Sequence, residues 1–442
     1  MIFFIISFLI FWGSSFLGLS SVTYIFLTLK GKNNDGIKFI PKALKKGAKY
    51  IISSKQIHNN RKKVLKTKNE IKFLKSFASL KRDKTTAKII AITGSAGKTS
   101  LKNLIKDVLQ KFGNTYCSPK SYNNKYGVPI SLSHLKTNHR FGVFEVGMSK
   151  KGEIDNLTKL IRPHIGVITN IGEAHIENFK NVKGIAGAKS EIIKNIQKNG
   201  TIILNRDDKF FNYLKKKAKI KNLKVLTFGV NKNSDICLKK VITNKNNKVL
   251  TIKIINQTLK IIIKNINYYN VLSSLALLKA LNLNFSQILN IYKNIEPTEG
   301  RGKIHKIYRY KKEFNFIDES YNANPLSVKN AIRNLNSIKK ENFKKYLLLG
   351  DMLELGHKSA ELHKDISKVI NNSDIDKVFV KGIKTLNTYK NIIKNKRGNI
   401  LQHESDLDFA LKNIIANNDY LMIKGSNATG LNDLSKRIIK GY

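Results

Sequence analysis

A glycine-containing turn between a buried strand and a helix constrains the fold of this chain more than any other feature. The apolar run Lys88–Ile92 leads directly into Thr93–Ser100, and an amphipathic segment, Thr99–Lys111, follows. Glycines allow backbone N–H groups to turn toward an anion, and the positive end of a helix dipole lies beside them. Lys98 is then placed to reach terminal phosphates, and the hydroxyl of Thr99 to hold Mg²⁺. The sequence therefore predicts a phosphate-binding loop for ATP with Mg²⁺.

This loop departs from the commonest spacing in one respect. The usual pattern has a glycine five residues before Gly97, where this chain has Ile92, so the match is to a shorter Thr-Gly-x-x-Gly-Lys-Thr variant. A tight turn with an incidental lysine is the alternative; the joint presence of strand, loop, Lys-Thr pair and helix favours phosphate binding. The expected nucleotide-binding residues are Gly94, Ser95, Ala96, Gly97, Lys98, Thr99 and Ser100.

Short apolar runs alternate with helical patterns after this loop, which is typical of βαβ units around a parallel sheet. The expected strands are Lys88–Ile92, Phe141–Val146, Ile165–Thr169, Thr201–Leu204 and Lys224–Phe228. Helices are expected at Thr99–Lys111 and Lys189–Gln197. Alternating residues in Asp235–Ile263 predict a hairpin with its turn at Asn244–Asn247.

Two polar segments, Lys81–Thr86 and Glu296–Gly300, are predicted linkers. They divide the chain into a small N-terminal α/β domain (1–83), a central ATP-binding domain (84–297) and a C-terminal α/β domain (298–442). The N-terminal domain is expected to hold a helix at Ile40–Lys46 between strands at Tyr24–Leu29 and Tyr50–Ile52. The expected C-terminal strands are Phe314–Ile317, Tyr346–Leu349, Lys377–Val380 and Tyr420–Ile423.

The amino terminus carries no charge from Met1 to Leu29, and Met1–Trp12 is almost wholly apolar. Glycine and serine dilute its second half, and a membrane span needs about 20 apolar residues. Two interpretations stay open for residues 1–23: a membrane anchor, with the basic chain from Lys30 onward in the cytoplasm, or an altered start of the first domain, which we favour. Two cysteines cannot form a disulfide framework, so a reducing cytoplasm is expected.

The excess of Lys and Arg, which gives a formal net charge of +51, is a feature shared with nucleic-acid-binding proteins. Here the lysines are spread along the whole chain among Asn and Ile, and no basic run is interleaved with aromatic residues. We therefore interpret the charge as a compositional bias and expect no nucleic-acid partner. A basic surface would still attract a polyanionic substrate.

Candidate metal ligands follow two of the expected strands. Glu145 ends one strand, and His175 follows another after a short turn. The carboxyl ends of parallel strands face the ligand crevice, and transfer of phosphate between anions requires a divalent metal and fixed cations. Each residue alone would more often be a surface group, but their positions after the phosphate loop favour Mg²⁺ binding. Lys189, at the start of an expected helix, is by itself one lysine among many.

Together these segments resemble the Mur ligase family. Thr93–Ser100 is similar to the family's ATP loop, Asn170–His175 to its metal-binding turn, and Ala188–Glu191 to the segment whose lysine is carbamylated. Three further segments are similar to the branch that uses D-alanyl-D-alanine: Ser121–Pro129, Asp318–Pro325 and Gly350–Gly356. The most specific part is Tyr321–Pro325, since other branches have Tyr-Ala-His-x-Pro or Ala-His-Asn-Pro there. The resemblance covers the chain from about Phe26 onward.

The resemblance implies a UDP-binding N-terminal domain, a central P-loop ATPase with a parallel sheet, and a Rossmann-like C-terminal domain. It implies a monomeric, cytoplasmic ligase of peptidoglycan synthesis whose substrates are UDP-N-acetylmuramoyl-tripeptide and D-alanyl-D-alanine. ATP would phosphorylate the terminal carboxylate of the tripeptide, the amine of D-alanyl-D-alanine would attack, and phosphate would leave. The same chemistry on another carboxylate and amine, or nucleotide binding without catalysis, are the alternatives.

The resemblance also implies a role for individual residues. Lys98, His175 and Lys189 would be catalytic. Metal would be held by Thr99, Glu145, His175 and Lys189 as a carbamate. Asn270 would contact adenine, Arg301 the phosphates and Asp318 the ribose. Substrate would be contacted by Asn123, Asn124, Asn322 and Asn324.

Three segments depart from the family pattern. The N-terminal domain of the family carries an Asp-Ser-Arg segment, which Leu19–Tyr24 lacks, so the uridine site is expected to differ. A Gly-x-His-Asn segment in the family is replaced by Lys264–Asn267 before the residue expected to contact adenine. Lys125 follows the paired asparagines, where the family more often has an acidic residue.

Overall fold

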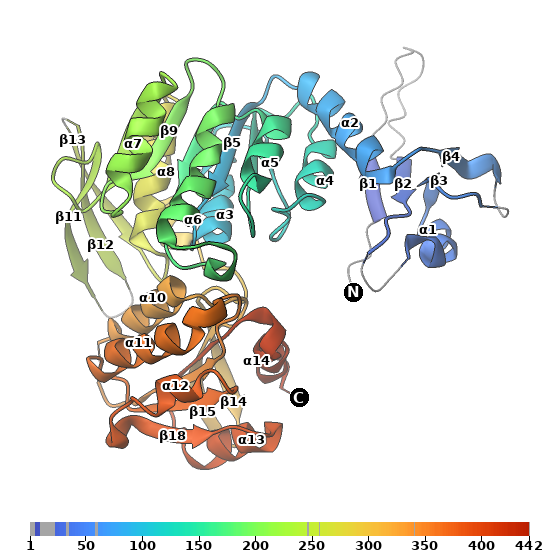
Figure 1. Cartoon of the computed structure of the whole chain (residues 1–442). Helices are drawn as coiled ribbons and strands as arrows, with labels where there is room; N and C mark the ends of the chain where they lie inside the picture. Colours follow the sequence, from blue (N-terminus) through green and yellow to red (C-terminus); the bar gives the residue numbers. More distant parts are fainter. Residues whose placement is uncertain are drawn as a thin grey trace.

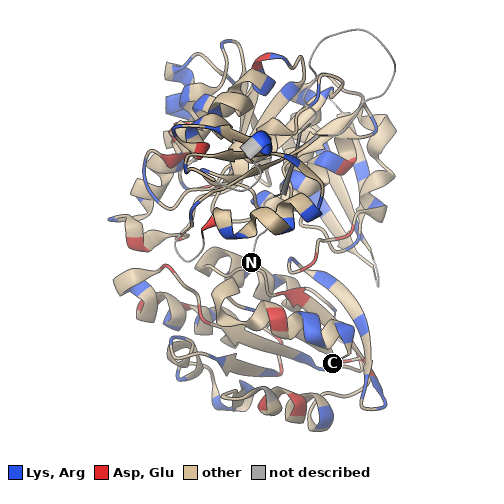
Figure 2. Cartoon of the chain, turned by 90° about the vertical axis from the view of Figure 1, so that its right-hand side faces the viewer, with Lys and Arg blue, Asp and Glu red and all other residues tan. Residues whose placement is uncertain are grey.

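The computed structural model describes residues 5–8, 23–31, 35–57, 61–244, 247–255, 257–339 and 341–441. Its strands form three separate sheets, which belong to an N-terminal, a central and a C-terminal part of the chain (Figure 1). The predicted α/β class is confirmed. Lys and Arg lie on helices and strands of both the central and the C-terminal parts (Figure 2), as their spread along the sequence leads one to expect.

The central sheet has nine strands in the order β13-β12-β11-β10-β9-β8-β5-β7-β6. Every neighbouring pair from β6 to β11 is parallel, and β11, β12 and β13 are antiparallel. The strands are β5 (Lys88–Thr93), β6 (Thr115–Cys117), β7 (Phe141–Glu145), β8 (Ile165–Ile168), β9 (Thr201–Asn205), β10 (Lys224–Gly229), β11 (Ile236–Thr243), β12 (Lys248–Ile254) and β13 (Gln257–Ile263). The predicted parallel strands and the hairpin after Asp235 are therefore present.

Helices cover both faces of this sheet because successive residues of a strand point to opposite sides. In β5, Ile90 and Ile92 pack on one side with α3 (Lys98–Leu109) and α8 (Tyr268–Ala280). Ile89 and Ala91 pack on the other side with α5 (Glu153–Ile161) and α6 (Val182–Lys189). Burial on both faces explains why these strands are continuous apolar runs in the sequence. The remaining helices of this part are α4 (Gly127–Ser133), α7 (Phe211–Ile220) and α9 (Ile291–Asn294).

The C-terminal sheet has six strands in the order β14-β15-β19-β16-β17-β18, and only the β14–β15 pair is antiparallel. Its strands are β14 (Lys303–Arg309), β15 (Lys312–Glu319), β16 (Lys345–Gly350), β17 (Lys377–Lys381), β18 (Arg397–Ile400) and β19 (Tyr420–Lys424). Its helices are α10 (Pro325–Asn336), α11 (Ser359–Asn371), α12 (Leu386–Tyr389), α13 (Glu404–Asn413) and α14 (Leu431–Lys440). Figure 1 shows α10 and α11 on the side of this sheet that faces the central part.

The N-terminal sheet has four strands, β1 (Ile5–Phe8), β2 (Thr23–Leu27), β3 (Ala48–Ser53) and β4 (Val64–Lys66), with helices α1 (Ile40–Lys45) and α2 (Glu70–Asp83). The first linker prediction is wrong for 81–83, because the polar end of α2 continues the helix to Asp83; Arg82 is buried and donates to the carbonyl of Ile161. The anchor considered for residues 1–23 lies mostly outside the described residues. Among the helices that are described, none combines the length and apolar character needed to cross a bilayer.

A second prediction fails around Lys189, which was expected to open a helix. It is instead the last residue of α6, and a 3₁₀ segment, Ser190–Asn195, follows it. Helix α6 is capped by Asn181, whose side chain accepts a hydrogen bond from the N–H of Gly184. Two glycines within α6 give it weak helix propensity, which is why its pattern is hidden in the sequence.

Candidate functional site

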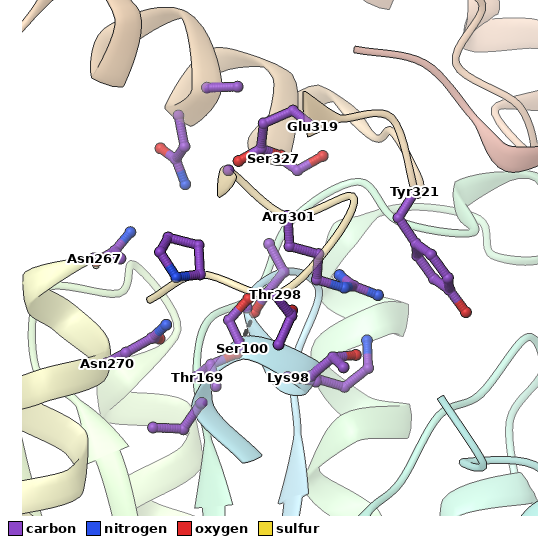
Figure 3. Close-up of a pocket in the computed structure, with 18 of the residues that line it drawn as sticks. Lys98, Ser100, Thr169, Asn267, Asn270, Thr298, Arg301, Glu319, Tyr321 and Ser327 are labelled. Carbon is purple, nitrogen blue, oxygen red and sulfur yellow. Dashed lines mark hydrogen bonds between the residues drawn. The ribbon is translucent and has the colours of Figure 1, made fainter. Parts of the chain in front are cut away.

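A cleft of about 2210 Å³ lies between the central and C-terminal domains. The phosphate loop lies on one side of it, and residues of the 296–302 connection and of the loop before α10 lie on the other. Figure 3 shows Lys98 extending into this space from the central domain and Arg301 from the connection opposite. The cleft therefore places residues far apart in the sequence around one volume.

Two glycines of the loop adopt conformations that other residues rarely take. Gly97 has φ of 80° and caps the start of α3, whereas Gly94 has φ of 152°. A Cβ atom on Gly94 would lie only 1.8 Å from the hydroxyl oxygen of Thr169. These glycines are required because one position is left-handed and the other is in close contact with the end of β8.

The turn after β8 holds the phosphate loop in place. Asn170 accepts a hydrogen bond from the N–H of Ala96 at 2.8 Å, and Thr169 donates to the carbonyl of the same residue at 2.7 Å. The hydroxyl of Ser95 bonds both the N–H and the carbonyl of Gly172. The loop is thus pre-organised by the segment that carries His175, although the sequence analysis assigned no role to Thr169.

Lys98 lies at the start of α3, and its ammonium donates to the carbonyl of Gly94 at 2.8 Å. Burial lowers its pKa, which the nearby Glu145 partly offsets and the positive charge of Arg301 reinforces. An anion between Lys98 and Arg301 would relieve this repulsion. The pair therefore forms a suitable binding site for the terminal phosphates of a nucleotide.

Glu145, at the end of β7, connects the phosphate loop to the asparagine-rich loop before α4. One carboxylate oxygen accepts from the hydroxyl of Thr99 at 2.8 Å, and the other accepts from the side chain of Asn123 at 2.7 Å. Glu145 is only 1% exposed. A hydroxyl and a carboxylate oxygen so close together are ligands that Mg²⁺ prefers, so the donor set fits the predicted metal.

Two residues that the sequence analysis did not single out join this cluster. The hydroxyl of Ser121 lies 3.4 Å from that of Thr99 and 3.5 Å from the guanidinium of Arg301. That guanidinium lies over the ring of Tyr321, 4.4 Å from its centroid. Ser121 and Tyr321 fall within segments that the family resemblance identified, but their contacts depend on the domain arrangement.

A buried lysine fixes the asparagine-rich loop against α3. Lys102 is fully buried, and its ammonium donates to the carbonyls of Ser118 and Lys120. The hydroxyl of Ser118 in turn accepts from the N–H of Glu145 at 3.1 Å. Asn124 lines the cleft, and its side chain accepts from the N–H groups of Tyr126 and of Gly127, the first residue of α4.

Asn324 clamps the C-terminal domain to the phosphate loop. Its side-chain oxygen accepts from the N–H of Ser327 and caps α10, whose first residue is Pro325. Its amide nitrogen donates to the carbonyl of Ser95 at 3.1 Å. Asn322 lines the cleft, and its side chain accepts from the N–H of Ala323. Capping α10 uses the oxygen of this amide, and the bond to Ser95 uses its nitrogen. Both needs are met by an asparagine directly before Pro325.

Asn270, in the first turn of α8, lies beside the phosphate loop. Its side-chain oxygen would be 3.5 Å from a Cβ atom on Gly97, and Figure 3 shows it next to Asn267 at one side of the cavity. Asn267 itself caps α8 by accepting from the N–H of Tyr269. The expected contact of Asn270 with adenine stays a prediction, and its position in the cleft is compatible with it.

His175 lies on the central-domain side of the cleft, in a left-handed backbone conformation with φ of 62°. Its Nδ1 atom is 2.5 Å from a carboxylate oxygen of Glu354, in the C-terminal domain. This contact lowers the pKa of Glu354. Metal binding by His175 stays a prediction; its second ring nitrogen is the one left for a metal.

Lys189 is 1% exposed at the end of α6. Burial, followed by the positive charge of Lys98, brings its pKa well below the ordinary value for lysine. Burial and the positive charge of Lys98 therefore both favour a neutral amine at Lys189.

Asp318 lies buried near the end of β15. It is 2% exposed, and its carboxylate accepts from the N–H of Gly300 at 2.7 Å and from the hydroxyls of Ser320 and Ser435 at 2.6 and 2.7 Å. These bonds join β15, α14 and the connection that carries Arg301. Contact with ribose stays a prediction, whereas the observed bonds give Asp318 a role in fixing Arg301.

Asp318→Asn is expected to destabilise the protein by about 1–3 kcal/mol, because a neutral amide turns N–H groups toward buried donors. The measurement is the shift in the midpoint of chemical unfolding. Asp433→Asn is the matched control, since the side chain of Asp433 is 80% exposed. Equal midpoints for the two variants would contradict the structural role of Asp318.

Comparisons with known proteins agree with this geometry. The chain matches the Mur ligase middle domain over residues 92–278 and the Mur ligase glutamate ligase domain over residues 304–427. It is 32% identical over 425 residues to the UDP-N-acetylmuramoyl-tripeptide–D-alanyl-D-alanine ligase of Buchnera aphidicola, covering 95% of this chain and 90% of that protein. The chain belongs to the Mur ligase family.

Solved structures of the family share the fold of this ligase. MurF from Acinetobacter baumannii is 25% identical with a TM-score of 0.83, and the match covers 94% of this chain and 90% of that one. MurF from Thermotoga maritima, solved in complex with ADP, is 24% identical with a TM-score of 0.80 and 95% coverage of both chains. The predicted resemblance to the family and the predicted three-part α/β architecture are confirmed.

Proposed function

We propose that this ligase joins D-alanyl-D-alanine to UDP-N-acetylmuramoyl-tripeptide, with ATP and Mg²⁺ as cofactors, in the synthesis of peptidoglycan precursors. The observation that carries the proposal is the cluster of Thr99, Glu145 and Asn123 beside the phosphate loop, in a cleft completed by Arg301 and Asn324. The choice of substrates is supported by the relative from Buchnera aphidicola and by the Tyr321–Pro325 segment.

The proposed reaction proceeds in two steps. The terminal carboxylate of the tripeptide attacks the γ-phosphorus of ATP, which gives an acyl phosphate and ADP. The amine of D-alanyl-D-alanine then attacks the acyl carbon, a tetrahedral intermediate forms, and phosphate leaves as the amide bond forms and the amine loses a proton. Both steps place negative charge in the cleft, so fixed cations must lie there.

The residues of this chain supply those cations and the geometry. Lys98 and Arg301 approach the phosphate region from opposite domains and would stabilise the transferring phosphoryl group. Thr99, Glu145, His175 and Lys189 would hold Mg²⁺, which neutralises phosphate charge when bound. Asn324 holds the loop before α10 against the phosphate loop through its bond to the carbonyl of Ser95.

Lys189 suits the carbamate that the family resemblance implies. A neutral amine reacts with CO₂ to form a carbamate and release a proton, whereas an ammonium does not. Burial and the charge of Lys98 favour the neutral amine at this position. The carbamate would then place an anion opposite Lys98 and relieve the repulsion between the two lysines.

The localisation and the oligomeric state belong to the same proposal. A reaction that consumes ATP fits the cytoplasm, as do two cysteines that form no disulfide. Most of the expected site residues line one cleft within a single chain, so we propose that the ligase works as a monomer.

Phosphate release by the purified full-length protein tests the proposed function. Release is expected to require ATP, Mg²⁺, the UDP-muramoyl tripeptide and D-alanyl-D-alanine together, and to yield one amide product per phosphate. A matched reaction with L-alanyl-L-alanine serves as the control for the acceptor. Preference for a different amine, or turnover with either substrate omitted, would assign the enzyme to another reaction.

A further inference from the structure

The Gly350–Gly356 segment is characteristic of the family branch, but the roles assigned so far do not use it. It follows β16 and lies against the turn after β8 in the central domain. The carboxylate of Glu354 reaches across to Nδ1 of His175 at 2.5 Å. That ring nitrogen is buried and forms no well-aligned hydrogen bond among the described residues, so its contact with Glu354 is a close approach of the two groups. A carboxylate of the C-terminal domain therefore contacts an expected metal ligand of the central domain.

The backbone at this contact is held in an unusual conformation on both sides. Glu354 has φ of 61° and His175 has φ of 62°, a region that residues other than glycine rarely adopt. The N–H of Glu177 also bonds the carbonyl of Glu354 at 3.3 Å. A strained backbone conformation of this kind persists only where the surrounding structure holds it in place. Such conformations occur most often at functional sites.

The loop that presents Glu354 is fixed by the C-terminal domain. The N–H of Met352 donates to the ring of the buried His363 at 3.0 Å, and the N–H of Leu353 donates to the hydroxyl of Ser426 at 3.0 Å. Ser426 also bonds the carbonyl of Ala323, in the loop before α10. The position of Glu354 is thereby linked to the loop that carries Asn324 and contacts the phosphate loop.

We propose that Glu354 is a positioning residue for His175. Its carboxylate accepts the proton on Nδ1, which fixes the imidazole tautomer and leaves Nε2 as the nitrogen that faces a metal. Because Glu354 belongs to the C-terminal domain, the metal site is complete only when this domain is docked. This inference rests on the proposed assignment of His175 as a metal ligand.

A plain surface ion pair is the competing explanation, and it makes a different prediction. The side chain of Glu354 is 48% exposed, and exposed pairs contribute little to stability. Loss of a plain ion pair would leave metal binding unchanged. Loss of an orienting carboxylate typically weakens metal binding by about 10- to 100-fold.

Binding of Mn²⁺ to the full-length protein saturated with ADP tests the inference, with electron paramagnetic resonance as the readout. Glu354→Gly removes the carboxylate and adopts the left-handed backbone without steric strain. It is expected to weaken Mn²⁺ binding by about 10- to 100-fold and to remove the nitrogen coupling of His175 to Mn²⁺ in the spin-echo spectrum. Glu354→Gln retains an acceptor oxygen, so it is expected to keep the coupling with a smaller loss of affinity.

Two further variants serve as controls for the Mn²⁺ measurements. Glu361→Gln changes an exposed glutamate of the same domain and is expected to bind Mn²⁺ as the wild type does. His175→Ala defines the spectrum without the imidazole. Wild-type affinity and nitrogen coupling in Glu354→Gly would overturn the inference, as would a His175→Ala spectrum identical to that of the wild type. Neither result would alter the phosphate-release assay, so failure here and failure of the proposed function can be told apart.

Discussion

Glu145→Gln is expected to lower kcat by about 10²- to 10³-fold, a loss typical for removal of one group that stabilises charge in a transition state. The substitution preserves the shape of the side chain. It removes the negative charge, and the amide offers one acceptor oxygen where two donors, from Thr99 and Asn123, now bond the carboxylate. One of these two donors would therefore face the N–H group of the new amide, without an acceptor, in a site that is almost fully buried.

The measurement is steady-state turnover over a range of Mg²⁺ concentrations, with ATP binding followed separately. The apparent affinity for Mg²⁺ is expected to fall, while ATP binding falls less because Lys98 and the loop amides remain. Glu153→Gln is a suitable control, since Glu153 also lines the cleft but, within the part of the chain that the structure describes, its side chain bonds only the backbone N–H groups of Ser149 and Lys150. If both variants turned over at the same rate, Glu145 would not be a metal ligand.

The sequence predicted the central domain well because its signals are local. The strand Lys88–Ile92, the glycine turn and the helix after it are adjacent in the chain, and the structure holds them as β5, the loop and α3. Continuous apolar runs identified the buried parallel strands for the same reason. Helix α6 was missed, because its glycines weaken the local pattern and tertiary packing of residues such as Ile185 stabilises it instead.

The side-chain contacts between separate elements could not be predicted in this way. Lys102 is one of 81 Lys and Arg residues, and only its complete burial against two carbonyls distinguishes it. Glu354 lies far along the chain from His175, so no spacing indicates that they meet. The bonds of Asp318 to Gly300 and to two serines could not be predicted from its segment either. The pattern of a single sequence shows periodicity and motifs. It does not show which donor bonds which acceptor once separate elements pack together.

Lys189→Ala is expected to abolish turnover, with a loss of at least about 10³-fold, because the site would lose both an anionic metal ligand and the charge that balances Lys98. Added bicarbonate is not expected to restore activity, since alanine has no amine to form a carbamate. Small carboxylates such as acetate are expected to restore part of it, because they fit the space left by the side chain and carry the same charge. Phosphate release with and without each anion measures this.

The response to these anions separates the carbamate from a cationic or purely structural lysine. Lys189→Arg keeps a positive charge, so a cationic role predicts that it is active and that acetate has no effect on Lys189→Ala. A structural role predicts a lower unfolding midpoint and no response to either anion. Mass spectrometry cannot substitute for this test, because a carbamate is lost in acid. Near-normal turnover by Lys189→Ala would exclude the lysine from the metal site, and Lys98 would then be balanced by Glu145 alone.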